Sequence, residues 1–483
     1  MLMSVCSILL WSSLVTQGLA SPFRMTDGNA HAQSAPRKEL PPISSKYLPP
    51  PIDDPWYKAP EGWADHPPGT ALKVRKHAYP TINIKHCADT WQVLFRSSNT
   101  HGAATWAVTT VFIPETHTNC SASHPEKCAH GIVSYQLASD SVWPNACPSY
   151  LLQARDPWGE LRDMLAEGWI LIAPDYEGPD AAFCTGKQTG YITLDNMRAV
   201  LNISDQLGMQ RDKIKLGMWG YSGGAAATEF AIEMAEHYAP ELKIDAAVVG
   251  GQTLNMTTVN QRINKNPAAG LVISSLLGIT MQYPEGREYL LSRIKETGPM
   301  NRTAFLDVEQ MTGLDALTIY YKKDIYDFFI DGEADMLHPM IQKIVDVDAV
   351  MGLHGTPKMP TFYYKAIEDE MSPASETDAL LERFCNEGAN ILYHRNSEGD
   401  HNTEWWTGRK RMIAYLSVYL DGSKRLEVPA TGCMTVNVSY PWDPTGMWPE
   451  WITSPIGPDG WPVDDDMHDW KLPQSAFLKL PPH

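Results

Sequence analysis

The sequence feature that most constrains the fold is the strand–turn–helix pattern around Ser222. An apolar run over 213–219 leads directly into Gly220-Tyr-Ser-Gly-Gly224, and a helix is expected over 225–238. A Gly-x-Ser-x-Gly motif alone fits an ordinary glycine turn as well as a nucleophile. Between a strand and a helix, however, it is typical of a nucleophile elbow, because small neighbours let the two elements approach around a strained serine. The motif therefore predicts Ser222 as a nucleophile, with Gly220 and Gly224 forming the elbow.

The rest of the chain alternates apolar strands with helices. Strands are expected at 91–96, 105–114, 131–136, 168–175, 213–219, 244–249, 361–367 and 389–394. Helices are expected at 161–166, 194–207, 225–238 and 409–420. This alternation predicts an α/β fold with a mostly parallel sheet covered on both faces. Residues 254–350 break the alternation with helix-like periodicity, which predicts a cap or lid between two parts of the core, 75–253 and 351–435.

A nucleophilic serine needs a base and an acid that orients it. In a fold of this class both follow the serine in chain order, on loops after later strands. The predicted strand 361–367 ends in Glu368-Asp369-Glu370, and the predicted strand 389–394 is followed by a loop that contains His401. An acidic turn or a single histidine is more often a solvated surface feature, but both at the expected strand ends favour a catalytic site. The residues alone leave the acid open among the three carboxylates.

Several separated motifs resemble one family. They are Gly220-Tyr-Ser-Gly-Gly224, Ala366-Ile-Glu-Asp-Glu-Met-Ser-Pro373, Ser397-Glu-Gly-Asp-His-Asn-Thr403 and Ser134-Tyr-Gln-Leu-Ala-Ser-Asp-Ser141, followed by Ala146-Cys-Pro-Ser-Tyr150. Together they are similar to the fungal secretory lipase family of α/β-hydrolases, of the lipase A type, over roughly residues 75–435. The resemblance implies an α/β-hydrolase fold with a cap.

The same resemblance implies roles for individual residues. Ser222 is then the nucleophile, His401 the general base and Asp369 the orienting acid, while Asp140 and the amide of Gly223 form the oxyanion hole. Ser139 stands where we expect an acidic residue, so this loop departs from the family pattern. Acyl transfer by this mechanism needs neither a metal ion nor an organic cofactor.

The reaction class leaves several substrates open. The leading hypothesis is a secreted serine ester hydrolase, with a true triacylglycerol lipase and an esterase or deacetylase of fungal secondary metabolites as alternatives. The charge-rich segments 285–298 and 320–329 favour an esterase over a strongly interfacial lid. Met281 and Met311 are candidates for an acyl pocket, although such residues are more often core. A serine peptidase and a non-catalytic binding protein are less favoured, because no site for a peptide terminus can be identified and every triad position is filled.

The N-terminal region indicates secretion. An apolar stretch followed by Gly18-Leu-Ala20 predicts a signal peptide over residues 1–20, and a proline-rich arm is expected over 21–74. Five sequons predict glycosylation at Asn119, Asn202, Asn255, Asn301 and Asn437. The seven cysteines beyond residue 20 match no zinc spacing, so disulfides are expected, with Cys120–Cys128 and Cys385–Cys433 as the pairs. An odd count leaves at least one free thiol.

Charge limits the partners. The net charge of −18 disfavours binding to nucleic acid, and a small-molecule or lipid ester is the expected partner. A transient lipid contact through the cap is one extension of this view, and the oligomeric state is left open. The tail over 436–483 is rich in tryptophan and proline and is expected to lie on the body of the protein. Within it, Asp464–Asp466 and His468 form a cation-site pattern, but a solvated turn is favoured because the calcium-loop spacing is missing.

Overall fold

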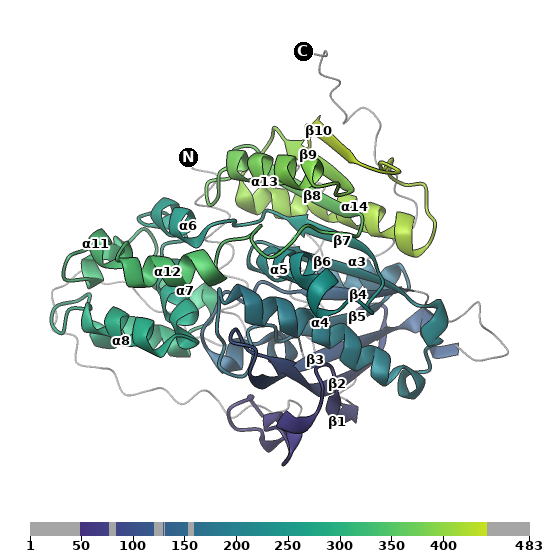
Figure 1. Ribbon diagram of the computed structural model, residues 1–483, viewed down its shortest axis with the longest axis horizontal. Helices are drawn as coiled ribbons and strands as arrows, with labels where there is room; N and C mark the ends of the chain where they lie inside the picture. Colours follow the sequence, from purple (N-terminus) through teal and green to yellow (C-terminus); the bar gives the residue numbers. More distant parts are fainter. Residues whose placement is uncertain (1–48, 77–83, 120–128, 130, 153–158, 442–483) are drawn as a thin grey trace, which may run out of the picture.

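The computed structural model describes residues 49–76, 84–119, 129, 131–152 and 159–441. Its centre is a ten-stranded sheet in the order β1-β2-β3-β5-β4-β6-β7-β8-β9-β10 (Figure 1). The strands are β1 Ala71–Lys76, β2 Cys87–Ser98, β3 Ala104–Pro114, β4 Gly131–Gln136, β5 Ile170–Pro174, β6 Lys215–Tyr221, β7 Ile244–Gly250, β8 Thr361–Ala366, β9 Ile391–Asn396 and β10 Cys433–Val438.

The sheet is antiparallel at one edge and parallel elsewhere. β1, β2, β3 and β5 pair antiparallel in that order, and every pair from β5 to β10 is parallel. Strands β4 to β9 are rich in apolar residues on both sides, as expected for a sheet that helices cover on both faces. The predicted mostly parallel sheet is confirmed.

Helices join the strands, and some of them cover the two faces of the sheet. They are α2 Pro148–Leu151, α3 Glu160–Ala166, α4 Gly186–Asn202, α5 Gly223–Tyr238, α6 Met256–Ile263, α7 Gly270–Met281, α8 Pro284–Ser292, α9 Arg302–Leu306, α10 Gly313–Ile319, α11 Glu333–Met336, α12 Pro339–Asp348, α13 Ala374–Asn386 and α14 His401–Leu420. One face of the sheet buries its side chains against α4, α5 and α13. The opposite face buries its side chains against α3 and α14.

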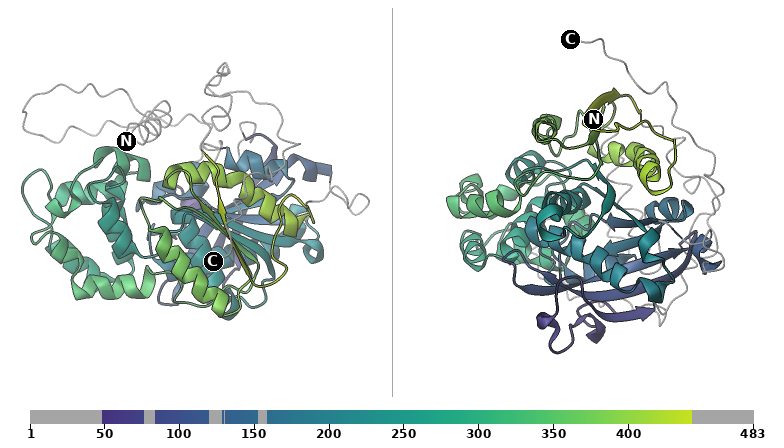
Figure 2. Two further views of the ribbon diagram at one scale, coloured as in Figure 1. Left: turned by 90° about the horizontal axis from the view of Figure 1, so that it is seen from above. Right: turned by 45° about the vertical axis from the view of Figure 1, so that its right-hand side comes forward.

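A helical cap lies between β7 and β8. Helices α6 to α12 and their short connections share a hydrophobic core of their own, in which Phe305, Phe328 and Phe329 meet edge to edge. Figure 2 shows these helices gathered at one end of the sheet. Because β6, β7 and β8 are parallel, their carboxyl ends share an edge, and the cap begins at this edge after β7. A β-bridge between Asn255 and Val350 brings the end of the cap back beside its start.

Several boundaries differ from the expected ones. The helix expected at 409–420 begins already at His401, because Asp400 caps its first turn by accepting from Thr403 N. The helix expected at 194–207 runs instead from Gly186 to Asn202, and a 3₁₀ turn follows at Ser204–Leu207. β10 was not expected. It pairs in parallel with β9, a strand that lies beside it only after the sheet has assembled.

The structure tests one of the two predicted disulfides. Cys385 and Cys433 form a disulfide with an S–S distance of 2.08 Å, which confirms that predicted pair, and Cys147 and Cys184 are free thiols. Cys120–Cys128, Asp464–Asp466 and His468 lie outside the described residues. Within the described ranges, no helix combines the length and apolar character needed to cross a membrane.

Candidate active site

Ser222 sits in a strained turn between β6 and α5. Its backbone has φ 55° and ψ −118°, a conformation that costs a non-glycine residue about 1–3 kcal/mol. The turn is held by the Ser222 N–H, which donates to the carbonyl oxygen of Gly250 at 3.0 Å. A Cβ atom on Gly220 would lie 2.0 Å from the oxygen of Gly224, and one on Gly224 would lie 1.9 Å from the oxygen of Gln136. The glycines therefore allow the close approach on which this turn depends.

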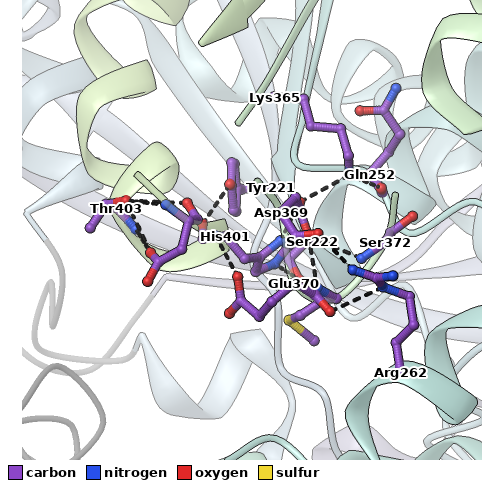
Figure 3. A network of polar contacts seen from close by, with 12 residues as sticks. Tyr221, Ser222, Gln252, Arg262, Lys365, Asp369, Glu370, Ser372, His401 and Thr403 are labelled. Carbon is purple, nitrogen blue, oxygen red and sulfur yellow. Dashed lines mark hydrogen bonds and ion pairs between the residues drawn. The ribbon is translucent and has the colours of Figure 1, made fainter. Parts of the chain in front are cut away.

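His401 bridges Ser222 and Asp369. Its Nε2 lies 2.8 Å from Ser222 Oγ, and its Nδ1 lies 2.8 Å from Asp369 Oδ2 (Figure 3). The ring is buried at the start of α14, and Tyr221 Oη donates to the His401 carbonyl oxygen at 2.7 Å. Burial opposes protonation of the ring, but the charge and hydrogen bond of Asp369 outweigh it and raise the pKa of His401.

Asp369 lies three residues beyond β8 and is held on both carboxylate oxygens. Oδ1 accepts from the N–H groups of Met371 and Ser372 at 2.9 and 3.0 Å. Oδ2 accepts from Lys365 Nζ at 2.9 Å in addition to its contact with His401. Burial alone would raise the pKa of Asp369, but the charges of His401 and Lys365 and these hydrogen bonds lower it well below its usual value. The carboxylate is therefore ionised at neutral pH.

The structure distinguishes the three carboxylates that the sequence left open. Glu368 is exposed, and Glu370 Oε2 accepts from the backbone N–H of His401 at 2.9 Å. Burial raises the pKa of Glu370. From the cap, Arg262 on α6 donates to the carbonyl oxygens of Asp369 and Glu370 at 3.3 and 3.2 Å. Among these acids it is Asp369 that contacts the imidazole ring.

Asp140 and Gly223 lie next to each other beside Ser222. A Cβ atom on Gly223 would lie 2.2 Å from Asp140 Oδ1, and Asp140 has a positive φ of 49°. Burial raises the pKa of Asp140 to about 6. The neighbouring Ser139 donates to Glu177 Oε1 at 2.9 Å, and burial raises the pKa of Glu177 well above its usual value. A serine at position 139 therefore avoids a second buried acid against Glu177.

Two cavities meet at Ser222, and both contact Asp140, Leu271 and Met371. The first encloses about 640 Å³, including its open mouth, and is lined mainly by apolar side chains, among them Phe183, Phe230, Val259, Ile263 and Met351. The second encloses about 1130 Å³ and carries polar side chains on its wall, among them Gln136, Glu160, Asn266, Thr318, Glu370 and Asn402. Leu271 and Met371 come from the cap and from the loop after β8, so both segments shape the two cavities.

Other candidate residues have different surroundings. Met281 and Met311 line neither cavity, and Met311 packs against the cap core. Of the sequon asparagines, Asn202 is exposed at the end of α4, Asn255 and Asn301 cap α6 and α9 with their side chains, and Asn437 accepts from Arg395 on β9. The backbone of Asn119 ends a 3₁₀ turn. Over the described residues, His, Cys, Asp and Glu side chains form no group of three or more that could hold a metal ion.

Lys365 is the residue at this site that the sequence interpretation missed. It lies inside the apolar strand Thr361-Phe-Tyr-Tyr-Lys-Ala366, four residues before Asp369, and its side chain is fully buried. A lysine within such a strand is itself an unusual signal, because buried ammonium groups require a paired carboxylate.

A serine at a strand-to-helix turn, followed in the chain by an acid and a histidine on a mostly parallel sheet, is the arrangement of the α/β-hydrolases. The model of the family described as "Secretory lipase" matches residues 160–427. The chain belongs to this secretory lipase family, which confirms the resemblance noted in the sequence.

The relatives include esterases and lipases. The chain is 37% identical to the trichothecene C-3 esterase of Fusarium sporotrichioides, over 81% of this chain and 88% of the relative. It is 34% identical to lipase A of Arthroderma benhamiae, over 77% and 80% of the two chains. The crystal structure of Candida antarctica lipase A in its closed state superposes with a TM-score of 0.68 at 25% identity, over 79% and 89% of the two chains. Together these relationships identify the protein as a carboxylic ester hydrolase.

Proposed function

We propose that Ser222, His401 and Asp369 form the catalytic triad of this hydrolase. The observation that carries the proposal is the pair of 2.8 Å contacts that His401 makes with Ser222 and Asp369. His401 takes the hydroxyl proton as Ser222 Oγ attacks the ester carbonyl, and Asp369 fixes the ring tautomer and stabilises the imidazolium. His401 then protonates the leaving alcohol, and water repeats the attack on the acyl-enzyme.

Gly223 and Asp140 complete the proposed machinery as the oxyanion hole, each through its backbone N–H, because an ionised carboxylate cannot donate a hydrogen bond. The Gly223 amide lies at the start of α5, where the helix dipole favours a developing negative charge. Asp140 adjoins Gly223 from the loop after β4 and contacts both cavities. Removing one donor of such a hole typically costs about 2.7–4 kcal/mol of transition-state stabilisation.

The two cavities support an assignment of the two halves of the ester. The apolar cavity suits an acyl chain, and the wider cavity with its polar wall suits an oxygen-bearing alcohol. We therefore favour an esterase with a bulky polar alcohol. The substrate named for the Fusarium sporotrichioides relative, a trichothecene ester, is the class to test first.

Two substitutions test the assignment of the acyl and alcohol halves of the ester separately. Ala226 lines the apolar cavity and Ala268 lines the wider one. Ala226→Leu should narrow the range of acyl lengths in a p-nitrophenyl ester series. Ala268→Leu should instead raise KM for acetate esters of large alcohols. If each variant affected the other half of the ester, the assignment would be reversed.

The triad itself is tested by p-nitrophenyl ester hydrolysis. Ser222→Ala should lower kcat by at least about 10³-fold while the melting temperature and KM change little. Equal rates for the variant and the wild type would remove the proposal and would favour a binding protein on this fold.

A triacylglycerol lipase is the second candidate, and one observation favours it. Of the large apolar side chains exposed in the described part of the chain, five belong to the cap, at Ile319, Ile330, Leu337, Met340 and Val347. Such side chains support transient contact with a lipid surface. A rate that rises sharply when long-chain triacylglycerol forms an emulsion would favour the lipase over the esterase.

Secretion through a signal peptide over residues 1–20 is part of the proposal. The family is a secretory one, and the segment is followed by small residues up to Ala20. N-terminal sequencing of the protein from culture medium should begin at Ser21. Treatment with a glycosidase would show whether the five sequon asparagines carry glycans.

A further inference from the structure

A buried cation lies behind the proposed acid. Lys365 on β8 is fully buried, and its Nζ donates to Asp369 Oδ2 and to the carbonyl oxygen of Gln252, each at 2.9 Å. Burying an ammonium group is costly unless it is paired and hydrogen-bonded. The triad chemistry itself does not require this group, because Met371 N and Ser372 N already bind the other carboxylate oxygen.

One oxygen atom is shared between Lys365 and His401. Asp369 Oδ2 accepts from Lys365 Nζ at 2.9 Å and contacts His401 Nδ1 at 2.8 Å (Figure 3). The ammonium nitrogen is therefore at most about 6 Å from the imidazole, a range in which two positive charges repel strongly in a buried site. Lys365 thus offsets part of the attraction that Asp369 exerts on a protonated His401.

The other charged and titratable groups around His401 are acidic or contact main-chain atoms. Glu370 accepts from the His401 N–H, Asp140 interacts with the ring through its charge, and Asp400 caps the helix that His401 begins. Tyr221 donates to the His401 carbonyl oxygen, and Arg262 donates to the carbonyl oxygens of Asp369 and Glu370. Among these groups, Lys365 is the cation that bonds to the carboxylate oxygen facing the ring.

We propose that Lys365 is a positioning residue that fixes the Asp369 carboxylate and, through its positive charge, keeps His401 a free base at lower pH than the surrounding acids would otherwise allow. The inference rests on the proposed triad and adds to it an electrostatic control. Asp369, Glu370 and Asp140 all favour protonated His401, which cannot accept the proton of Ser222. The positive charge of Lys365, hydrogen-bonded to Asp369 Oδ2, opposes the effect of these acids.

The test is the pH profile of kcat/KM for a p-nitrophenyl ester, measured on the full secreted chain. Lys365→Met removes the charge and the donor, and Lys365→Gln removes the charge but keeps a donor. Both should move the acid limb of the profile upward by about one pH unit, because the imidazolium loses a repulsive neighbour. Lys365→Arg keeps the charge and should leave the limb within about 0.3 units of the wild type.

A matched control separates local from general charge effects. Lys358 lies before β8, pairs with Glu236 at 3.5 Å, and has a side chain that is 55% exposed. Lys358→Met removes the same charge from the surface and should leave the limb in place, because solvent screens exposed charges. If Lys365→Met does not fold, Lys365→Gln still tests the inference. An NMR titration of His401 can then compare Ser222→Ala with the double variant Ser222→Ala, Lys365→Gln.

The outcomes distinguish a failure of the inference about Lys365 from a failure of the proposed triad. Folded Lys365 variants that lose rate at every pH but keep the acid limb would show a purely structural role and would overturn the inference. A limb that moves equally in Lys358→Met would also overturn it. Wild-type hydrolysis that Ser222→Ala does not reduce would instead overturn the triad, whatever the Lys365 variants do.

Discussion

Glu370 accepts a hydrogen bond from the backbone N–H of His401 at 2.9 Å, so the loop after β8 holds the first residue of α14 in place. Neighbouring acids on this loop thus act at two points, Asp369 on the ring and Glu370 on the main chain. The contact also satisfies an N–H group at a helix N-terminus, where the helix dipole favours a negative charge.

Removing the Glu370 carboxylate should displace the His401 ring, although the ring itself stays in the site. Glu370→Ala should lower kcat/KM by about 10- to 100-fold, because His401 is the proposed general base and small displacements of such a group are costly. Glu370→Gln keeps an acceptor oxygen and should retain most of the activity. Ester hydrolysis rates measured with purified variants check this, and equal losses in both would assign the effect to charge.

The acid that contacts the ring should matter far more than its exposed neighbour. Asp369→Asn should lower kcat by about 10³–10⁴-fold, because an amide cannot stabilise the imidazolium and favours the wrong tautomer. Glu368 is exposed, and Glu368→Gln serves as the matched control with a rate within about twofold of the wild type. A large loss in the control and none in Asp369→Asn would exchange the two assignments.

The wild-type enzyme should lose activity on the acid side at a pH above the ordinary histidine value of 6.5, because Asp369 raises the pKa of His401. In the proposed triad, His401 must be neutral to accept the Ser222 proton, so kcat/KM is expected to fall as the pH drops through that pKa. A profile of kcat/KM against pH for a neutral ester measures the midpoint. A midpoint well below 6.5 would contradict the expected balance of charges.

The elbow should tolerate no side chain at Gly224. A Cβ atom there would lie 1.9 Å from the backbone oxygen of Gln136, so Gly224→Ala should destabilise the fold by about 3 kcal/mol or more, or abolish secretion. Gly102 has φ 77° but no neighbour within 4 Å, so Gly102→Ala should cost only about 1–2 kcal/mol. Denaturant unfolding of both variants gives the comparison, and equal losses would mean that crowding at the elbow is unimportant.

The disulfide between Cys385 and Cys433 should stabilise the end of the sheet. It joins the last turn of α13 to β10 across 48 residues, and its loss should cost about 2–4 kcal/mol of unfolding free energy. Because either substitution breaks the same bond, Cys385→Ser, Cys433→Ser and the double variant should lose similar amounts. Additive losses in a urea titration would show that the side chains act separately from the bond.

Local sequence patterns predicted much of the fold. The strand before Ser222 and the helix after it were visible because apolar periodicity and small residues are short-range signals. The order of the serine, the acidic turn and the histidine placed the three segments at strand ends. The start of α14 at His401 was missed, because the Asp400 cap is a weaker signal than the apolar period that begins later.

By itself, the sequence determined the reaction class and a short set of candidate residues, since the Gly-x-Ser-x-Gly motif and the order of the acidic turn and the histidine after it are encoded along the chain. Only the tertiary structure decided which carboxylate faces His401, because Glu368, Asp369 and Glu370 are equivalent until the turn after β8 is folded. It also brought Lys365 to the same carboxylate oxygen and gave Ser222 two unlike cavities. These relationships depend on contacts between residues far apart in the chain, which no local pattern contains.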